Sequence, residues 1–425
     1  MPVRRRRRAA AAWAGAIAAA ALAALLIPAV ARADWQRQSS PSARRYTGVV
    51  FADALRGWAT NADGTLAVTT DGGAHWRACY PVPGEILRDV AYVPPSHVWI
   101  VGNMGTIVVS HDSGLTWQTE RSGTCYGLFS VHFASDALHG WTVGNGGRIL
   151  HTTDGGANWE RQVSGTDVLL YGVTCTGPDT ACAVGDNGLI LRTTDGGATW
   201  KQAPSATDKE LNAVCFAGAD DGWAVGSFGT VVHTTDGGAS WVAQSSGTDR
   251  AFEDVAFLAD ARTGWAVGNG GTIVHTADGG LSWEQQPSYA GTYLYGVCFA
   301  DGLNGWAVGW TGTILHTTDG GLPDVTAPVT HAPRAARVSQ GGSAHLGFRV
   351  FDPDDSEVRV TVKVRSPSGR LKRTLDAGLR PTGIYQSCPY PRVALAPGTY
   401  RFTVFAVDHA GNRQSRAGTN RLTVR

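Results

Sequence analysis

The chain has 425 residues, enough for two or three domains, and its 36 Lys and Arg nearly balance its 35 Asp and Glu. With this balance of charge we expect no nucleic-acid partner. The 55 Gly and 15 Trp, against only two Met, indicate many tight turns around large apolar anchors, a composition typical of an all-β protein.

Residues 1–33 have the three parts of a secretory signal peptide. Arginines occupy positions 4–8, an Ala-rich apolar run follows at 9–30, and a small-x-small cleavage site stands at 31–33. The consecutive arginines leave the Sec and twin-arginine export routes both open. No later segment is long and apolar enough to span a bilayer. We therefore expect a secreted or extracytoplasmic mature chain that begins near Asp34 and has no transmembrane segment.

A unit of 41 or 42 residues repeats seven times in the next part of the chain. Each unit has a short apolar strand ending in an aromatic or similar residue, a GWAVG-like strand, and a GTILHTTDGG-like strand with its turn. A fourth strand follows a second Trp. Four short strands in about 40 residues describe one blade of a β-propeller. We therefore predict a seven-bladed propeller over 34–324, whose turns carry Asp71, Asp112, Asp154, Asp195, Asp236, Asp278 and Asp319.

The seventh unit ends after TTDGGLPD, without its second Trp and fourth strand. The missing piece occurs at the start of the mature chain, where DWQRQ at 34–38 resembles NWERQ at 158–162. Trp35 also lies the usual sixteen residues before the aromatic Phe51. We predict that the N-terminal strand completes the last blade and closes the ring, which removes exposed sheet edges.

The repeated turn has the pattern [ST]-x-D-x-G-x-x-W, as at 110–117, 152–159, 193–200 and 234–241, and resembles the Asp-box of bacterial neuraminidase repeats. A short carboxylate can accept backbone N–H groups that a turn leaves unpaired, and Gly allows positive φ. Seven such Asp residues around a ring cannot converge on one substrate. We interpret them as structural and not catalytic.

Histidines stand three residues before the Asp in four units, but Val or Arg stands there in the other three. Because successive units lie on different blades, these His side chains cannot gather round one metal. We interpret them as packing residues, and we expect no metal and no cofactor. The four are His151, His233, His275 and His316.

The cysteines carry one specific signal. In six units an aromatic residue and a Trp are expected to face each other across the first hairpin, as Phe216 with Trp223, whereas unit four has Cys175 and Cys182 at these two places. This double change predicts a disulfide. Cys215 and Cys298 have the pattern of small buried residues. Pairing of Cys79, Cys125 and Cys388 stays open, and at least one of the seven cysteines has no partner within the chain.

A second module follows a Pro-rich linker at 325–331. Residues 332–425 alternate apolar and polar side chains, and LAPGTYRFTVFAVDHAGN resembles the last hairpin of bacterial immunoglobulin-like or fibronectin-like domains, so we predict a β-sandwich. Residues 34–330 hold 14 Lys and Arg against 29 Asp and Glu, whereas residues 331–425 hold 16 against 6. The basic module would bind an anionic cell envelope or attract the acidic propeller, and both interpretations stay open.

Residues that depart from the repeat mark the candidate binding face. The turn after AVG and the segment that starts each first strand share one face, opposite the Asp-box turns. Exposed aromatic and cationic side chains in a shallow basin are typical of binding surfaces, although each is equally compatible with an ordinary surface residue. The turns carry Met104, Phe228 and Trp310, and the strand starts carry Arg44, Arg45, Arg88, Tyr126, Lys209, Arg250 and Tyr293.

The combination GWAVG…GTIVHTTDGG…W, repeated seven times over roughly 34–324, resembles the photosystem II assembly and stability factor family of β-propellers. The resemblance implies a chaperone that binds assembling reaction-centre subunits without catalysis. The family's arginine patch has no match residue by residue, and Arg44, Arg45 and Arg88 are its nearest equivalents here. The immunoglobulin-like module departs from the minimal family architecture. It favours a general secreted scaffold, monomeric and bound to a protein or an envelope polymer, and leaves open whether the host photosynthesises.

Two other functions compete with this interpretation. A sialidase-like site would combine an arginine triad (Arg44, Arg88, Arg250) with Glu253 and Tyr295, and another glycoside hydrolase would use two of Glu85, Glu210, Glu253 and Asp254. Seven regular blades without inserted catalytic loops argue against an enzyme. Adhesion to the cell envelope through the basic module is compatible with the scaffold function.

Overall fold

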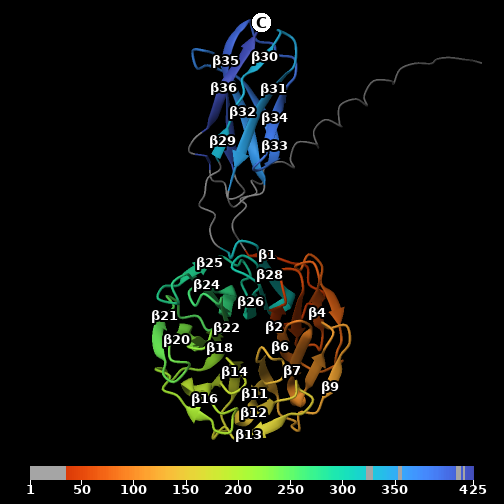
Figure 1. The fold of residues 1–425 in the computed structure, drawn as a ribbon, viewed down its shortest axis with the longest axis vertical. Coiled ribbons are helices and arrows are strands. Elements are labelled where there is room, and N and C mark those ends of the chain that lie inside the picture. The colour runs from red at the N-terminus through yellow and green to blue at the C-terminus, as the bar shows by residue number, and fades with distance from the viewer. Residues whose placement is uncertain (1–34, 322–328, 353–356, 408–412, 415–416) are drawn as a thin grey trace, which may run out of the picture. The chain divides into compact units, whose positions relative to one another are not determined.

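The computed structural model describes residues 35–321, 329–352, 357–407, 413–414 and 417–425. They belong to two compact units, Ala33–Pro323 and a second that contains Asp324–Arg425 (Figure 1). The predicted signal peptide at 1–33 lies outside the described residues, as do positions 325–328 of the predicted linker. The remaining linker positions form strand β29 (Val329–His331), so the second module begins earlier than predicted. No helix in the described part of the chain is long and apolar enough to cross a membrane.

Among the described residues, the first unit contains seven four-stranded antiparallel sheets. The first strands are β2 (Tyr46–Phe51), β6 (Leu87–Val93), β10 (Leu128–Phe133), β14 (Leu170–Cys175), β18 (Leu211–Ala217), β22 (Phe252–Phe257) and β26 (Leu294–Phe299). The second strands are β3 (Gly57–Asn61), β7 (His97–Gly102), β11 (Gly140–Gly144), β15 (Ala181–Gly185), β19 (Asp221–Gly226), β23 (Gly264–Gly268) and β27 (Gly305–Gly309).

The outer half of each sheet is shorter. The third strands are β4 (Leu66–Thr69), β8 (Ile107–Ser110), β12 (Arg148–Thr152), β16 (Ile190–Thr193), β20 (Thr230–Thr234), β24 (Ile273–Thr276) and β28 (Thr313–Thr317). The fourth strands are β5 (Arg77–Cys79), β9 (Gln118–Glu120), β13 (Glu160–Gln162), β17 (Lys201–Gln202), β21 (Val242–Ser245), β25 (Glu284–Gln286) and β1 (Gln36–Arg37). Single 3-10 turns join second to third strands: η1 (Asn103–Gly105), η2 (Asn145–Gly147), η3 (Asp186–Gly188), η4 (Ser227–Gly229), η5 (Asn269–Gly271) and η6 (Trp310–Gly312).

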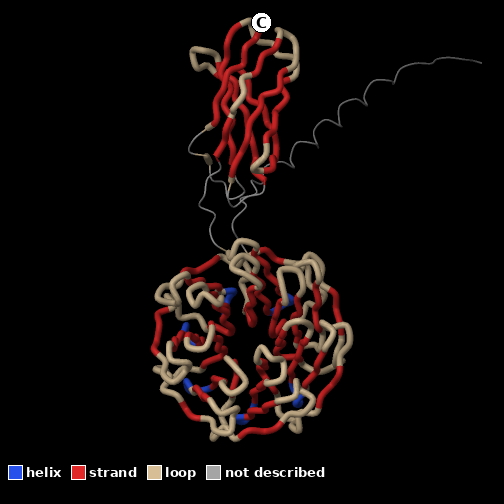
Figure 2. The backbone as a smooth tube through the Cα atoms, viewed as in Figure 1, coloured by secondary structure: helices blue, strands red, loops and turns tan. Residues whose placement is uncertain are grey.

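The seven sheets form a ring. The first strands of successive sheets contact one another, and β26 of the last sheet contacts β2 of the first. Figure 2 shows the sheets arranged around a common centre. The last sheet takes its fourth strand from the start of the chain, because β1 pairs with β28 and places Gln36 opposite His316. The predicted closing strand is therefore present, and the unit is a β-propeller.

A buried Trp in the second strand joins six of the seven sheets to the next, and the fourth sheet has Cys182 at this position. Trp265 is fully buried, stacks on Phe299 of the next sheet at 3.5 Å between ring centroids, and donates its indole N–H to the Gly320 carbonyl at 3.0 Å. That carbonyl also accepts a hydrogen bond from Gln286.

Trp99 donates in the same way to Gly155, but no second donor reaches that carbonyl in the described structure. Equivalent stacks pair Trp99 with Phe133, Trp223 with Phe257, and Trp306 with Phe51.

The expected disulfide between Cys175 and Cys182 is wrong for this structure, in which both cysteines are free and buried. The expected facing pair does not exist, because Phe216 lies opposite Gly222 and Trp223 opposite Cys215. The aromatic residue and the Trp of one unit therefore contact different neighbouring sheets.

Cys175 accordingly packs with the preceding sheet, where its sulfur lies 3.1 Å from Nδ1 of His132. Cys182 packs against Gly238 of the following sheet.

The Asp-box carboxylates accept hydrogen bonds within their own turns. In the fourth sheet, Oδ1 of Asp195 accepts hydrogen bonds from the Thr193 hydroxyl at 2.8 Å and the Thr199 N–H at 2.9 Å. The Thr199 hydroxyl donates to Oδ2 at 2.6 Å, and these bonds lower the pKa of Asp195 to about 2. A Ser or Thr two residues earlier makes the same bond to all seven Asp residues. The HTTDGG stretch is thus a capped turn.

The repeated histidines pack on the tryptophans of their own sheets. His151 stacks on Trp141 at 4.2 Å between ring centroids, and His316 stacks on Trp306 at 4.5 Å. Burial lowers the pKa of His151 and of His316 to about 4, so both rings are neutral at pH 7. Within the described residues, no group of three or more His, Cys, Asp or Glu side chains is placed to hold a metal ion.

The second unit has a three-stranded sheet, β29–β31–β34, and a five-stranded sheet, β30–β36–β35–β32–β33. Inward side chains of both sheets form one apolar core that includes Phe348, Val360 and Phe402. Alternating buried and exposed residues along β32 produce this arrangement. The strands are β30 (Ala336–Val338), β31 (Ala344–Phe351), β32 (Glu357–Arg365), β33 (Leu371–Pro381), β34 (Tyr385–Tyr390), β35 (Gly398–Val407) and β36 (Gly418–Val424).

Candidate functional site

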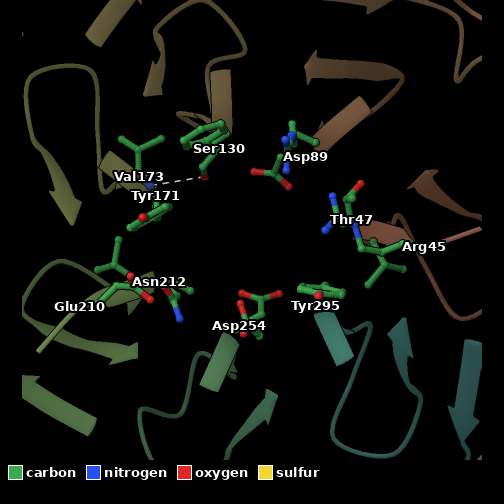
Figure 3. A pocket seen from close by; sticks show the side chains of 18 residues that line it. Arg45, Thr47, Asp89, Ser130, Tyr171, Val173, Glu210, Asn212, Asp254 and Tyr295 are labelled. Carbon is green, nitrogen blue, oxygen red and sulfur yellow. Dashed lines mark hydrogen bonds between the residues drawn. The ribbon is translucent and has the colours of Figure 1, made fainter. Parts of the chain in front are cut away.

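A cavity of about 340 Å³ lies at the centre of the propeller, at the end where the first strands begin. The second residue of the first strand lines it in every sheet, together with neighbouring residues of several sheets. Figure 3 shows side chains from successive sheets pointing into this common opening. The seven are Thr47, Arg88, Phe129, Tyr171, Asn212, Glu253 and Tyr295. We call this set the mouth ring.

A β-bulge explains why these side chains reach the cavity. In all seven first strands the register with the second strand shifts between the first and the third residue, so the second residue has no partner in the ladder. A bulge bends the strand and re-aims the unpaired side chain. The repeat therefore supplies one freely variable position per sheet, all at the same depth in the channel.

Several polar groups of the cavity connect neighbouring sheets. The Thr47 hydroxyl donates to the Leu87 carbonyl at 2.9 Å, and Asn212 Nδ2 donates to the Phe252 carbonyl at 2.8 Å. The Ser130 hydroxyl accepts the Val173 N–H at 3.3 Å (Figure 3). These bonds hold first strands together across three of the junctions in the ring.

Two partly buried aspartates do the same with their carboxylates. Asp254 accepts the Val255 N–H at 2.8 Å and the Val297 N–H of the next sheet at 2.9 Å. Asp89 accepts the Val131 N–H at 2.9 Å. Burial raises the pKa of Asp254 to about 7 and also raises that of Asp89, against the opposing effect of these hydrogen bonds. Both carboxylates are therefore structural cross-links.

The basic side of the mouth is formed by two arginines that lie over aromatic rings. The Arg45 guanidinium lies 5.2 Å from the centroid of the Tyr295 ring, and Arg88 lies 5.3 Å from that of Phe129. Arg88 also donates to Oδ1 of Asn103 at 2.9 Å. Burial and the neighbouring Arg45 lower the pKa of Arg88. Each arginine is thus held in place by a ring while its charge stays at the cavity wall.

The acidic side of the mouth is formed by Glu210 and Glu253. Glu210 accepts a hydrogen bond from the Ser227 hydroxyl at 3.0 Å. Burial, and then the charge of Glu210, raises the pKa of Glu253 to about 7. Within the described structure, Glu253 forms no hydrogen bond or ion pair. The pKa of Tyr171 is also raised, first by burial and then by nearby carboxylates.

Exposed apolar side chains surround the cavity on the 3-10 turns. Met104 and Phe228 are 66% and 72% exposed, and both hold a left-handed backbone, with φ of 54° and 59°. The Lys209 ammonium lies 5.9 Å from the Phe228 ring. In the last sheet, Trp310 and Tyr293 are both exposed, with ring centroids 6.1 Å apart.

The structure sorts the predicted binding residues into three groups. Arg45 and Arg88 line the cavity. The exposed residues of the surrounding rim are Met104, Tyr126, Lys209, Phe228, Tyr293 and Trp310. Arg44 and Arg250 are exposed and do not line the cavity.

The sialidase-like constellation is not assembled, whereas two of the glycoside-hydrolase carboxylates share the cavity. Only Arg88 of the sialidase-like triad lines the cavity, together with Glu253 and Tyr295. Of the four candidate carboxylates for a glycoside hydrolase, Glu85 lies outside the cavity wall and Asp254 is held by two backbone N–H groups. This leaves Glu210 and Glu253, which both lie on the acidic side.

Sequence reasoning missed four members of the mouth ring, namely Thr47, Phe129, Tyr171 and Asn212. The signal was present in the repeat. These positions recur at the same place in each unit as Arg88, at intervals of 41 or 42, and differ in chemistry from unit to unit. Variation at one structurally constant position points to a surface that the fold does not need.

The fold and its Asp-box turns define a β-propeller of the bacterial neuraminidase repeat class. A sequence model of the family described as photosynthesis system II assembly factor YCF48 matches residues 80–167, 162–247 and 241–324. The chain belongs to this family. A search of curated proteins finds no match.

Three solved structures show the same fold. YCF48 bound to a D1 peptide is 20% identical with a TM-score of 0.56, covering 69% of this chain and 99% of that one. YCF48 from Cyanidioschyzon merolae is 21% identical with a TM-score of 0.56, covering 67% of this chain and 98% of that one. The structure of U3-55K is 8% identical with a TM-score of 0.59, with coverage of 67% and 98%.

Proposed function

We propose that this protein is a secreted, non-catalytic scaffold that binds a segment of another protein at the channel mouth. One observation carries the proposal. The mouth ring and its rim bring exposed aromatic, cationic and anionic side chains around one cavity, at positions that the repeat does not constrain. Partially exposed aromatic and arginine side chains are the residues that dominate protein interfaces.

The comparisons support a protein ligand. The chain belongs to a family of assembly factors, and a propeller of the same fold is solved with a D1 peptide. Non-catalytic action is supported by the carboxylates of the cavity, since Asp89 and Asp254 are used to join sheets. A sialidase-like activity has less support, because only one arginine of its triad lines the cavity. Another glycoside hydrolase has less support because its two remaining carboxylates, Glu210 and Glu253, lie on the same side of the cavity.

The proposal includes an architecture. The seven sheets are the blades of a closed seven-bladed propeller, and the second unit is an immunoglobulin-like domain whose two sheets share one core. Residues 1–33 are a signal peptide that directs the chain out of the cytoplasm, which the arginines and the apolar run support. The excess of Lys and Arg in residues 331–425 favours envelope adhesion as a second activity.

The test is a pull-down from the host's extracytoplasmic fraction with mature protein beginning at Asp34. An Arg45→Ala/Arg88→Ala variant removes the cations of the cavity wall, and Arg44→Ala/Arg250→Ala removes two exposed cations outside it as a matched control. We expect a discrete protein partner that the first variant loses and the control retains. Equal retention by both variants would contradict binding at the mouth. Turnover of a glycoside substrate that Glu253→Gln abolishes would contradict the non-catalytic function.

A further inference from the structure

We propose that the bound protein segment presents an aromatic side chain next to a basic one, and that the last sheet and the acidic side of the mouth receive this pair. The aromatic platform consists of Tyr293, Tyr295 and Trp310, and Glu253 supplies the charge. This inference rests on the proposed protein-binding function and specifies the chemistry of its ligand.

The platform is a group of three rings that the fold does not use as core. Tyr293 and Tyr295 stack at 5.9 Å between ring centroids with an interplanar angle of 12°. Trp310 lies 6.1 Å from the first and 6.4 Å from the second. Trp310 is 46% exposed, whereas the repeated Trp of the same sheet, Trp306, is fully buried. The three rings therefore present a partly open aromatic surface at the edge of the cavity.

Trp310 also differs in residue type from the equivalent position of the other 3-10 turns. It is the first residue of η6, where the other five turns have a short polar residue, namely Asn103, Asn145, Asp186, Ser227 and Asn269. The turn forms in all six cases, so its geometry does not require a large ring. An exposed indole at such a position is typical of a contact residue, because Trp combines large apolar area with low entropy cost.

Glu253 supplies a charge beside this platform. It lies on β22, directly next to β26, which carries Tyr295, and both residues line the cavity. In the described structure its carboxylate has no hydrogen-bond partner and no ion pair, although most of it is removed from water. The charge of Arg45 acts on Glu253 and opposes the rise of its pKa, but the Arg45 guanidinium lies over the Tyr295 ring and forms no ion pair with Glu253 in the described structure. A half-buried carboxylate without a partner gains most from a cation that arrives with the ligand.

These two features together select the occupant. An aromatic or large apolar side chain fits the exposed face of the platform, and a Lys or Arg next to it would pair with Glu253, supported by the charge of Glu210. A neutral sugar would also stack on the rings but offers no cation to Glu253 and Glu210 on the acidic side of the cavity. The charge therefore favours a basic protein segment over a neutral glycan.

The test uses end-blocked synthetic peptides in a Gly-Ser background, with a Trp-Lys, Trp-Glu or Ala-Lys core, and measures binding to the full mature chain by calorimetry. We expect the Trp-Lys peptide to bind at least tenfold more tightly than either of the others. Glu253→Gln should reduce the preference for Trp-Lys over Trp-Glu to below threefold. Trp310→Asn, which restores the residue of the equivalent turns, should weaken Trp-Lys binding at least fivefold.

Leu281→Ala is the matched control. Leu281 is 80% exposed on an Asp-box turn, and these turns lie at the opposite end of the third strands from the 3-10 turns. Equal affinity for Trp-Lys and Trp-Glu, loss of affinity in Leu281→Ala, or no binding of any peptide would overturn the inference. So would binding of a neutral oligosaccharide that Trp310→Asn abolishes while the peptides do not compete. The pull-down separates this failure from a failure of the proposed function. If a protein partner is still lost with Arg45→Ala/Arg88→Ala, the proposed function stands although the inference about its ligand fails.

Discussion

The closing strand offers the most direct test of how the ring is held together. Trp35 precedes β1, is 2% exposed, packs edge-on against Phe299 and donates its indole N–H to Oε1 of Gln286 at 2.9 Å. Replacing a buried Trp by Ala costs about 3–5 kcal/mol, and loss of the hydrogen bond adds about 1 kcal/mol, since Gln286 keeps its bond to Gly320. We expect Trp35→Ala to lower the free energy of unfolding by about 4–6 kcal/mol.

The matched control is Trp76→Ala. Trp76 has the equivalent edge-on contact with Phe51 and the equivalent bond at 3.0 Å, to Gln38 directly after β1, but it is only half-buried. We expect it to cost about half as much, because less apolar area is removed from water. Urea unfolding followed by tryptophan fluorescence gives both values. An equal or smaller loss for Trp35→Ala would refute the conclusion that its contacts hold the ring closed.

Three further outcomes are expected. Trp99→Phe should lower the free energy of unfolding by about 1 kcal/mol more than Trp265→Phe in the same urea assay. The reason is that Trp99 is the one donor found for its buried carbonyl in the described structure, whereas the carbonyl bound by Trp265 keeps a second donor. Phe228→Asn should raise the free energy of unfolding by about 0.5 kcal/mol, since Asn tolerates the left-handed backbone. The same variant should weaken partner binding in the pull-down. Burial lowers the pKa of His151 and His316 to about 4, below the unfolded value of about 6.5, so their contribution to stability is complete above pH 6.5 and is lost as the pH falls toward 4. The free energies of unfolding from urea titrations at pH 7.5 and 5 should differ by about 1–2 kcal/mol less in the His151→Val/His316→Val variant, after allowance for solvent screening of the partly exposed rings. An unchanged difference would contradict the linkage.

Much of the fold was predictable because the same pattern of strands and turns recurs in seven units of the sequence. The period of 41 or 42 located the strands, and the unmatched Trp35 predicted the pairing of β1 with β28. The partner of each buried aromatic was not predictable in the same way. A repeat gives equivalent positions within a unit, but Trp223 and Phe257 meet across two units, so the contact is invisible to a reading that compares units one at a time. The wrong disulfide followed from this.

The candidate site was predictable in part. Exposed residues such as Trp310 departed from an otherwise constant turn and were found on that ground. Glu253 and Tyr295 were noticed only as members of catalytic constellations, and Tyr171 was missed, because the bulge that turns these side chains into the cavity leaves no mark in composition. Arg44 and Arg45 are adjacent in sequence, and only the backbone direction decides that Arg45 reaches the cavity.

The pairing of β1 with β28 also sets an order of events during synthesis. Six sheets consist of four consecutive strands and can form as the chain leaves the ribosome, since domains and local units fold from the N-terminus onward. The seventh cannot, because its fourth strand is made first and its other three are made last: Gln36 pairs with His316, 280 positions later (316 − 36). Until residue 317 is available, the ring stays open and both of its edges remain exposed. Completion is therefore a late, long-range step that depends on the whole propeller having been made.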